Sequence, residues 1–172
     1  MPKFSYSNMN FDVAPVGVYV AQVINAKKAI SRTNKNEMIE LTLHTIPDGY
    51  TLKYYLVFNA RNDSLITQFC KFCEGELLFP EDPNIECSLT AADTMFRLVF
   101  VDVVHETDEG GDDPRARIKF GGILSRAKAL ARAPELANVR RPANVPPPKN
   151  LAMMPTNETP STGNVPFPDD DN

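Results

Sequence analysis

The sequence predicts a mainly β fold with five strands, one helix between the third and fourth strands, and a disordered C-terminal tail. Three observations lead to this prediction. Short segments of alternating apolar and polar residues recur along the first two thirds of the chain. A single helical pattern interrupts them, and prolines gather near the C-terminus.

The clearest strand pattern lies at residues 38–46, where Ile39, Leu41 and Leu43 alternate with polar side chains. A two-residue period of this kind is typical of a strand that buries one face. The segments between the strands are rich in residues that form turns. The five strands are expected at residues 18–24, 38–46, 50–58, 94–104 and 115–120.

The helix is expected over residues 63–74, with Asn62 as its N-cap and Gly75 as its stop. The order is then three strands, one helix and two strands. This order matches a five-stranded Greek-key barrel of the OB type, whose helix lies between the third and fourth strands. A five-stranded sheet with a packed helix in another topology remains open.

The chain divides into two parts. Residues 1–125 form the expected OB-type domain, and residues 126–172 form a Pro-rich, largely disordered tail with an acidic end. Nine of the 15 prolines lie between Pro134 and Pro168. Residues that bury apolar surface are scarce there, so the segment cannot offset its ordering entropy. A short basic helix is expected at residues 125–137, before the disordered part.

Charge is strongly segregated along the chain. Residues 1–114 carry nine basic and seventeen acidic side chains, and residues 115–150 carry nine basic and one acidic. Residues 151–172 carry four acidic side chains and no basic ones. This segregation favours a polyanionic partner for the middle block and a separate role for the acidic end. The simpler alternative is a solvated surface.

Other function classes have less support. The chain has no apolar signal region at its N-terminus and no long apolar run for a membrane span, and an odd number of cysteines favours a reducing cytoplasm. Cys70 and Cys73 have zinc-ligand spacing but lack a second pair, so no metal or other cofactor is expected. Motifs of common enzymes are missing, which favours a protein that is not an enzyme.

Binding to unpaired nucleic acid needs basic side chains that follow the phosphates and exposed rings on which bases stack. Because strand residues alternate, only one of Tyr54 and Tyr55 can face outward, and Tyr55 shares its face with Lys53. On the last strand, Phe120 is expected on the core face. The predicted binding residues are Lys27, Lys28, Arg32 and Lys35 in one loop, Lys53 and Tyr55 on the third strand, and Arg115, Arg117 and Lys119 on the fifth.

Two parts of the sequence resemble single-stranded DNA-binding proteins, and among these the small bacteriophage type. The first is the opening with Pro15, Gly17 and Tyr19, followed by Val23, Ala26, Lys27 and residues 31–41. The second is the acidic tail. Bacterial members of this group end in an acidic tip with Pro-Phe, whereas here Pro166 and Phe167 precede the aspartates.

The resemblance implies a protein that binds single-stranded DNA without sequence preference and protects unpaired strands during phage DNA replication or recombination. It also implies that the tail recruits replication or recombination proteins. An RNA-binding OB module and a protein-interaction or assembly factor are the alternatives, and a homodimer remains open. The expected docking residues are Phe167, Asp169, Asp170 and Asp171.

Overall fold

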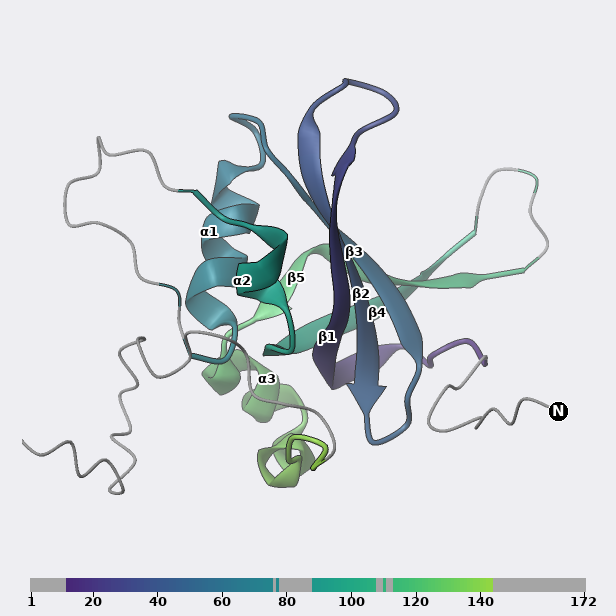
Figure 1. Ribbon diagram of the computed structural model, residues 1–172. Coiled ribbons are helices and arrows are strands. Elements are labelled where there is room, and N and C mark those ends of the chain that lie inside the picture. The colour runs from purple at the N-terminus through teal and green to yellow at the C-terminus, as the bar shows by residue number, and fades with distance from the viewer. Residues whose placement is uncertain (1–11, 76, 78–87, 108–109, 111–112, 144–172) are drawn as a thin grey trace, which may run out of the picture.

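A computed structural model describes residues 12–75, 77, 88–107, 110 and 113–143, and all structural statements concern these residues. Among them, no helix is long and apolar enough to cross a membrane. Figure 1 shows a curved sheet with helices on one side and at one end. The elements are β1 (Gly17–Ile30), β2 (Glu37–Ile46), β3 (Thr51–Val57), α1 (Asp63–Phe72), α2 (Ala91–Thr94), β4 (Leu98–Glu106), β5 (Arg115–Leu124), α3 (Arg126–Arg132) and the 3-10 helix η1 (Pro134–Asn138).

The five strands form one antiparallel sheet in the order β3-β2-β1-β4-β5. The predicted mainly β fold, the number of strands and the presence of α1 between β3 and β4 are confirmed. The prediction of a single helix there and of a strand from residue 94 is wrong, because α2 occupies Ala91–Thr94 and β4 begins at Leu98. The sheet is open, however, with β3 and β5 as its two edges. A closed barrel is therefore not what these strands form.

Strand β1 is longer than predicted. It continues to Ile30, so half of the expected loop at residues 25–36 is strand, and the turn is confined to residues 31–36. The register explains this. Val23 pairs with Leu43 and Asn25 with Thr42, so Ile24 is an extra residue at which the strand bends while it keeps its pairing with β2.

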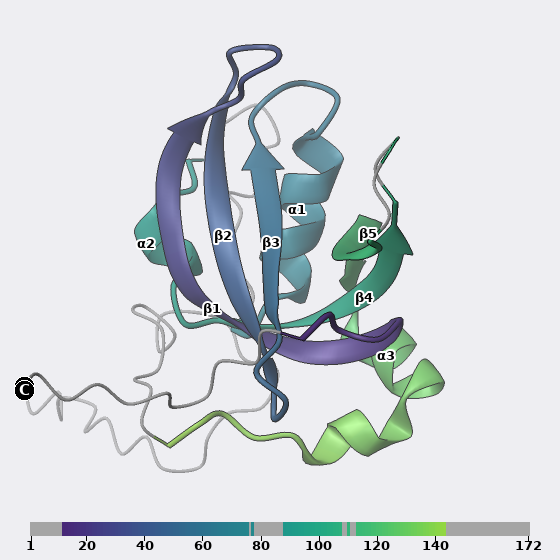
Figure 2. The ribbon, with the colours of Figure 1, turned by 90° about the vertical axis from the view of Figure 1, so that its right-hand side faces the viewer.

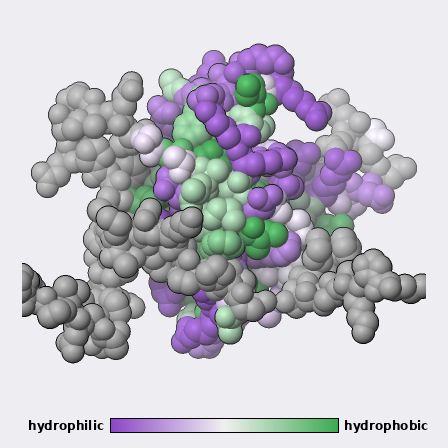
Figure 3. All heavy atoms as spheres, viewed as in Figure 1, coloured by the Kyte–Doolittle hydropathy of each residue, from purple (hydrophilic) through white to green (hydrophobic). Residues whose placement is uncertain are grey.

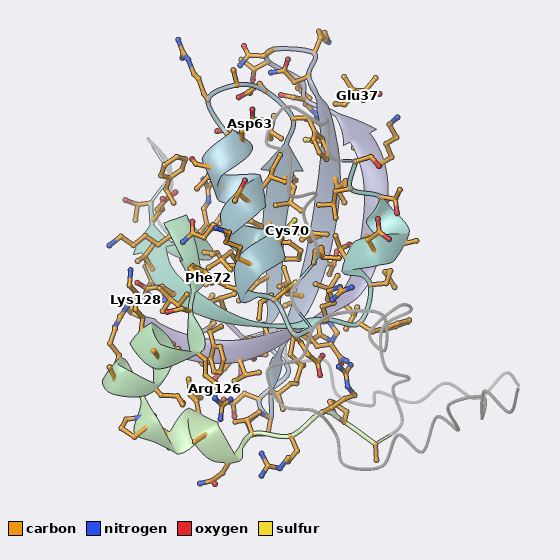
Figure 4. All side chains as sticks on the ribbon, turned by 90° about the vertical axis from the view of Figure 1, so that its left-hand side faces the viewer. Glu37, Asp63, Cys70, Phe72, Arg126 and Lys128 are labelled. Atoms are coloured by element: carbon orange, nitrogen blue, oxygen red, sulfur yellow. The ribbon has the colours of Figure 1, made fainter. Side chains whose placement is uncertain are left out.

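The main core lies between the sheet and α1. Leu41, Leu43 and Val101 are fully buried on the inner face of the sheet, and Phe69 of α1 packs against them. Figure 4 shows α1 across the strands, with Asp63 at its start and Phe72 at its end. Burial of each such side chain stabilises the fold by roughly 1.5–3 kcal/mol, so α1 is held firmly in place.

A second, smaller core fixes the segment after β5 to the sheet. Ala133 and Leu136 pack with Val20 of β1. Arg132 of α3 also donates two hydrogen bonds to the carboxylate of Asp102, at 2.7 and 3.2 Å. The basic helix expected at residues 125–137 is thus present as α3 and η1, and ordered structure continues past residue 125.

Strand β5 contains a large bulge that simple alternation did not predict. Val103 pairs with Ile118, and Val101 pairs with Ile123, so four residues of β5 lie opposite the single Asp102 of β4. Strict alternation would put Phe120 opposite Val101, on the core face. Ile123 occupies that position and is fully buried, whereas Phe120 is 81% exposed. The expectation that Phe120 faces the core is therefore wrong.

The bulge depends on two consecutive glycines. Gly121 has a φ of 66°, a conformation that few side chains tolerate. At Gly122 a Cβ atom would lie only 2.6 Å from the carbonyl oxygen of Lys119 and 3.1 Å from that of Asp102. Both contacts are with backbone, which cannot move aside without shifting the strand.

We predict that Gly122→Ala lowers the free energy of unfolding by about 1–3 kcal/mol, the usual range for overpacking. Chemical denaturation measures this change. Gly121→Asn is the matched control, because asparagine tolerates a positive φ and the nearest contact of a Cβ there is at 3.9 Å. An equal loss in both variants would show that crowding at Gly122 is not the cause.

Candidate nucleic-acid interface

An open groove of about 650 Å³ lies between the two edge strands. Strand β3 forms one wall and β5 the other, and the first turns of α1 contribute Leu65 and Ile66. Figure 2 shows this arrangement, with α1 visible between β3 and β5. The groove exists because the sheet is open between β3 and β5. It is lined by the edges of these two strands, by apolar side chains at its floor and by exposed side chains.

Two exposed aromatic rings line the groove, one on each wall. Tyr55 of β3 is 49% exposed, and Phe120 of β5 is 81% exposed. Tyr54 lies on the opposite face of β3, in the core, where burial raises the pKa of its hydroxyl group. The expected facing of the two tyrosines is thus the observed one. Exposed rings of this size are the kind of surface on which bases stack.

Lys53 takes part in a polar network on the outer face of the sheet. Its Nζ donates hydrogen bonds to Glu40 Oε1 at 2.8 Å and to Thr42 Oγ1 at 2.7 Å. Lys27 Nζ lies 3.5 Å from the same carboxylate oxygen. Lys27, Glu40 and Tyr55 are direct neighbours across three strands. Two predicted cations therefore share one carboxylate beside the exposed tyrosine.

This network changes the acidity of Glu40. The hydrogen bond from Lys53, together with the positive charges of Lys53 and Lys27, holds the pKa of Glu40 below its ordinary value. Glu40 therefore keeps its negative charge to a lower pH than an ordinary glutamate does. It partly neutralises the two lysines that sequence reasoning assigned to phosphate binding.

The cations of β5 are distributed unevenly. Arg115 and Arg117 line the groove, and Arg117 lies 3.0 Å from the carboxylate of Glu106. Lys119 is exposed but does not belong to the groove lining. Beyond β5, Arg126 and Lys128 project from α3 as further exposed cations (Figure 4).

The expected loop cluster of four cations is not one cluster. Because β1 extends to Ile30, Lys27 and Lys28 are strand residues, and alternation places them on opposite faces. Lys28 forms an ion pair of 2.8 Å with Glu37. Only Arg32 and Lys35 lie in the turn, where both are exposed. Figure 3 shows hydrophilic residues gathered over this end of the sheet.

Sequence reasoning missed Phe120 as a site residue, and also the acidic partners Glu40 and Glu106. The pair Gly121 and Gly122 was the available signal, because consecutive glycines within a strand pattern indicate a bulge. The ion pairs had no comparable signal, since they depend on the register between strands.

The two cysteines with zinc-ligand spacing lie in the core. Cys70 and Cys73 are buried against the sheet, and burial raises the pKa of the Cys73 thiol. Within the described part of the chain, no three or more His, Cys, Asp or Glu side chains lie together so that they could hold a metal ion. His105 also has a structural contact, because its Nε2 lies 2.7 Å from the carbonyl oxygen of Ala14.

The docking residues predicted in the tail, Phe167, Asp169, Asp170 and Asp171, lie outside the described residues, so their role stays a prediction. Comparison of the sequence with protein-family models and with curated proteins gave no match.

We predict that Lys53→Met raises the pKa of Glu40 toward the ordinary value of about 4.3. The substitution removes the hydrogen bond that favours the ionised carboxylate. In the unmodified protein this ion pair stabilises the fold above the ordinary pKa, and the stabilisation is lost as the pH falls through the lowered pKa. A carbon NMR titration of the glutamate carboxyl groups measures the change.

Lys28→Met is the control for this titration. Lys28 pairs with Glu37, so its removal should leave the pKa of Glu40 unchanged. Equal shifts in the two variants would mean that general surface charge, rather than the contact with Lys53, sets the acidity of Glu40.

Proposed function

We propose that the protein binds single-stranded DNA, without sequence preference, in the groove between β3 and β5. The observation that carries the proposal is the joint presence of two exposed rings, Tyr55 and Phe120, and the cations Lys53, Arg115 and Arg117 in one groove. Rings that accept the faces of bases, beside cations that attract phosphates, are the usual elements of a single-strand site.

The strand order supports an OB-type interpretation of the fold. In an OB fold the five strands form a partly open Greek-key barrel, and oligonucleotides bind on the face of the second and third strands and at the adjoining loops. Here β1 pairs with both β2 and β4, and the edges β3 and β5 flank the same groove. The groove thus lies beside β3, one of the two strands whose face binds nucleic acid in OB folds.

The proposed mechanism combines stacking with phosphate contacts. One base stacks on Tyr55 and another on Phe120, while the phosphates between them pass Lys53 and the arginines of β5. Every base offers a face for stacking, so this mode of binding is insensitive to sequence. In duplex DNA both faces of each base are covered by neighbours, so the rings favour unpaired strands.

The biological setting is also a proposal. We propose that the bound strands are intermediates of phage DNA replication or recombination in the host cytoplasm, and that the acidic tail recruits other proteins of these processes. The support is the resemblance of the opening and of the tail to single-stranded DNA-binding proteins. The charge segregation agrees with it, since an acidic segment and a basic site suit different partners.

We predict that Tyr55→Ala and Phe120→Ala each weaken binding to a thymidine oligonucleotide by about 1–3 kcal/mol, the range for one lost stacking contact. Both rings are exposed, so the free energy of unfolding should change little. Ile30→Ala is the matched control, because Ile30 is 62% exposed and does not line the groove. Fluorescence anisotropy with a labelled oligonucleotide measures the affinity.

The same titrations separate the competing functions. Single-stranded DNA, duplex DNA and RNA are compared at several salt concentrations, because phosphate contacts make the affinity fall with salt. Tighter binding of RNA would indicate an RNA-binding module that reads the 2′-hydroxyl group. Failure to bind any of the three would reject nucleic-acid binding and leave a protein-interaction factor.

We predict that Glu40→Gln tightens the binding of single-stranded DNA by about twofold to fivefold, the range of an exposed ion pair. The substitution removes the negative charge that competes with phosphate for Lys27 and Lys53. Glu37→Gln is the control with the same change of charge, because Glu37 pairs with Lys28 outside the groove. If both variants gain equally, net charge and not local competition explains the effect.

A further inference from the structure

Gln68 joins α1 to the bulge of β5. Its side-chain Nε2 donates one hydrogen bond to the carbonyl oxygen of Gly121 at 3.1 Å and another to that of Ile123 at 2.7 Å. Gly121 is one of the four bulge residues, and Ile123 is the residue opposite Val101 at which pairing with β4 resumes. One amide group therefore bridges a helix and the irregular part of a strand.

Gly121 has no cross-strand partner in β4, so Gln68 supplies a donor to its carbonyl, and the bond to Ile123 holds the residue at which pairing resumes. Extra residues in a bulge are left without their cross-strand partners, and a buried carbonyl without a donor costs about 1–3 kcal/mol. Gln68 supplies the donor from outside the sheet. Since Phe69, the next residue of α1, is fully buried, the helix holds Gln68 at a fixed position relative to the sheet.

The bulge in turn sets the direction of Phe120. The ring is 81% exposed and lines the groove because Ile123, and not Phe120, fills the core position opposite Val101. The backbone at Gly121 has a φ of 66°, so the strand direction changes immediately after Phe120. The orientation of the ring is thus linked to the two carbonyls that Gln68 binds.

We infer that Gln68 is a positioning residue for the binding groove: through its two hydrogen bonds to the β5 bulge, it holds the Phe120 ring where an unpaired base can stack on it. This inference rests on the proposed function. It adds a residue that touches no DNA and acts only through Phe120.

The test is a double-mutant cycle on the full chain, with a labelled thymidine oligonucleotide. Gln68→Met keeps the size of the side chain but removes the donor, and we expect it to weaken binding by on the order of tenfold. In a protein that already carries Phe120→Ala, the same change should have almost no further effect. Combined with Tyr55→Ala, it should have its full effect.

A second measurement reports the ring position without DNA. The protein is labelled with fluorophenylalanine, and the fluorine resonance of residue 120 is assigned from its loss in Phe120→Leu. In Gln68→Met this resonance should shift or broaden, because the bulge is no longer held in one conformation. Ser64→Ala, an exposed substitution on the same helix, should leave it unchanged.

Gln68→Leu, which also lacks the donor and adds no charge, replaces the methionine variant if thermal unfolding shows that the latter is not folded. An unchanged resonance and unchanged affinity in the folded variant would overturn the inference. An equal loss of affinity with and without Phe120 would also overturn it. If the unmodified protein binds no DNA, the proposed function fails, and the resonance alone decides whether Gln68 positions the ring.

Discussion

The pairing of β1 on both sides determines the rest of the architecture. Residues Gly17–Gln22 pair with β4 and residues 20–30 pair with β2. A single strand therefore links the β2–β3 part of the sheet to the β4–β5 part. The extra residue Ile24 lets β1 bend near the end of the segment that pairs with β4 while it keeps its pairing with β2. As a result β3 and β5 become the two edges, and the curvature brings them to opposite walls of one groove. The groove follows from the path of β1 and needs no separate element to form it.

The bulge of β5 places Ile123 in the core and leaves the ring of Phe120 exposed. Leaving a phenylalanine in water forgoes roughly 1.5–3 kcal/mol of burial. Here Ile123 lies at the core position opposite Val101 and is fully buried, so an apolar side chain still fills that position. The two glycines at positions 121 and 122 permit the backbone conformation of the bulge. Gln68 donates hydrogen bonds to the carbonyl oxygens of Gly121 and Ile123. The exposure of Phe120 is therefore a stable property of the fold.

Sequence patterns predicted the elements well wherever burial follows a simple period. The alternation in β2 and the apolar stripe of α1 gave both elements nearly as they are, and the exposure of Tyr55 followed from the face it shares with Lys53. The end of β1 was missed because its last residues are polar and resemble a loop, although pairing with β2 keeps them extended. The direction of Phe120 was missed because a bulge breaks the two-residue period on which the prediction rested. The opening of the sheet depends on long-range geometry that no local pattern encodes.

The balance of charge and rings bears on how such a groove would select its ligand. Lys27, Lys53 and Arg117 each lie beside a carboxylate, so a phosphate gains only the difference between its own attraction and that of the resident group. That difference is small for exposed pairs, and it diminishes further as salt screens charges over roughly 8 Å. In the proposed function, stacking of bases on Tyr55 and Phe120 would not be screened in this way. Cations in this arrangement would attract any nucleic acid to the groove. The rings would retain only unpaired strands, because their bases can unstack from one another and stack on Tyr55 and Phe120 instead.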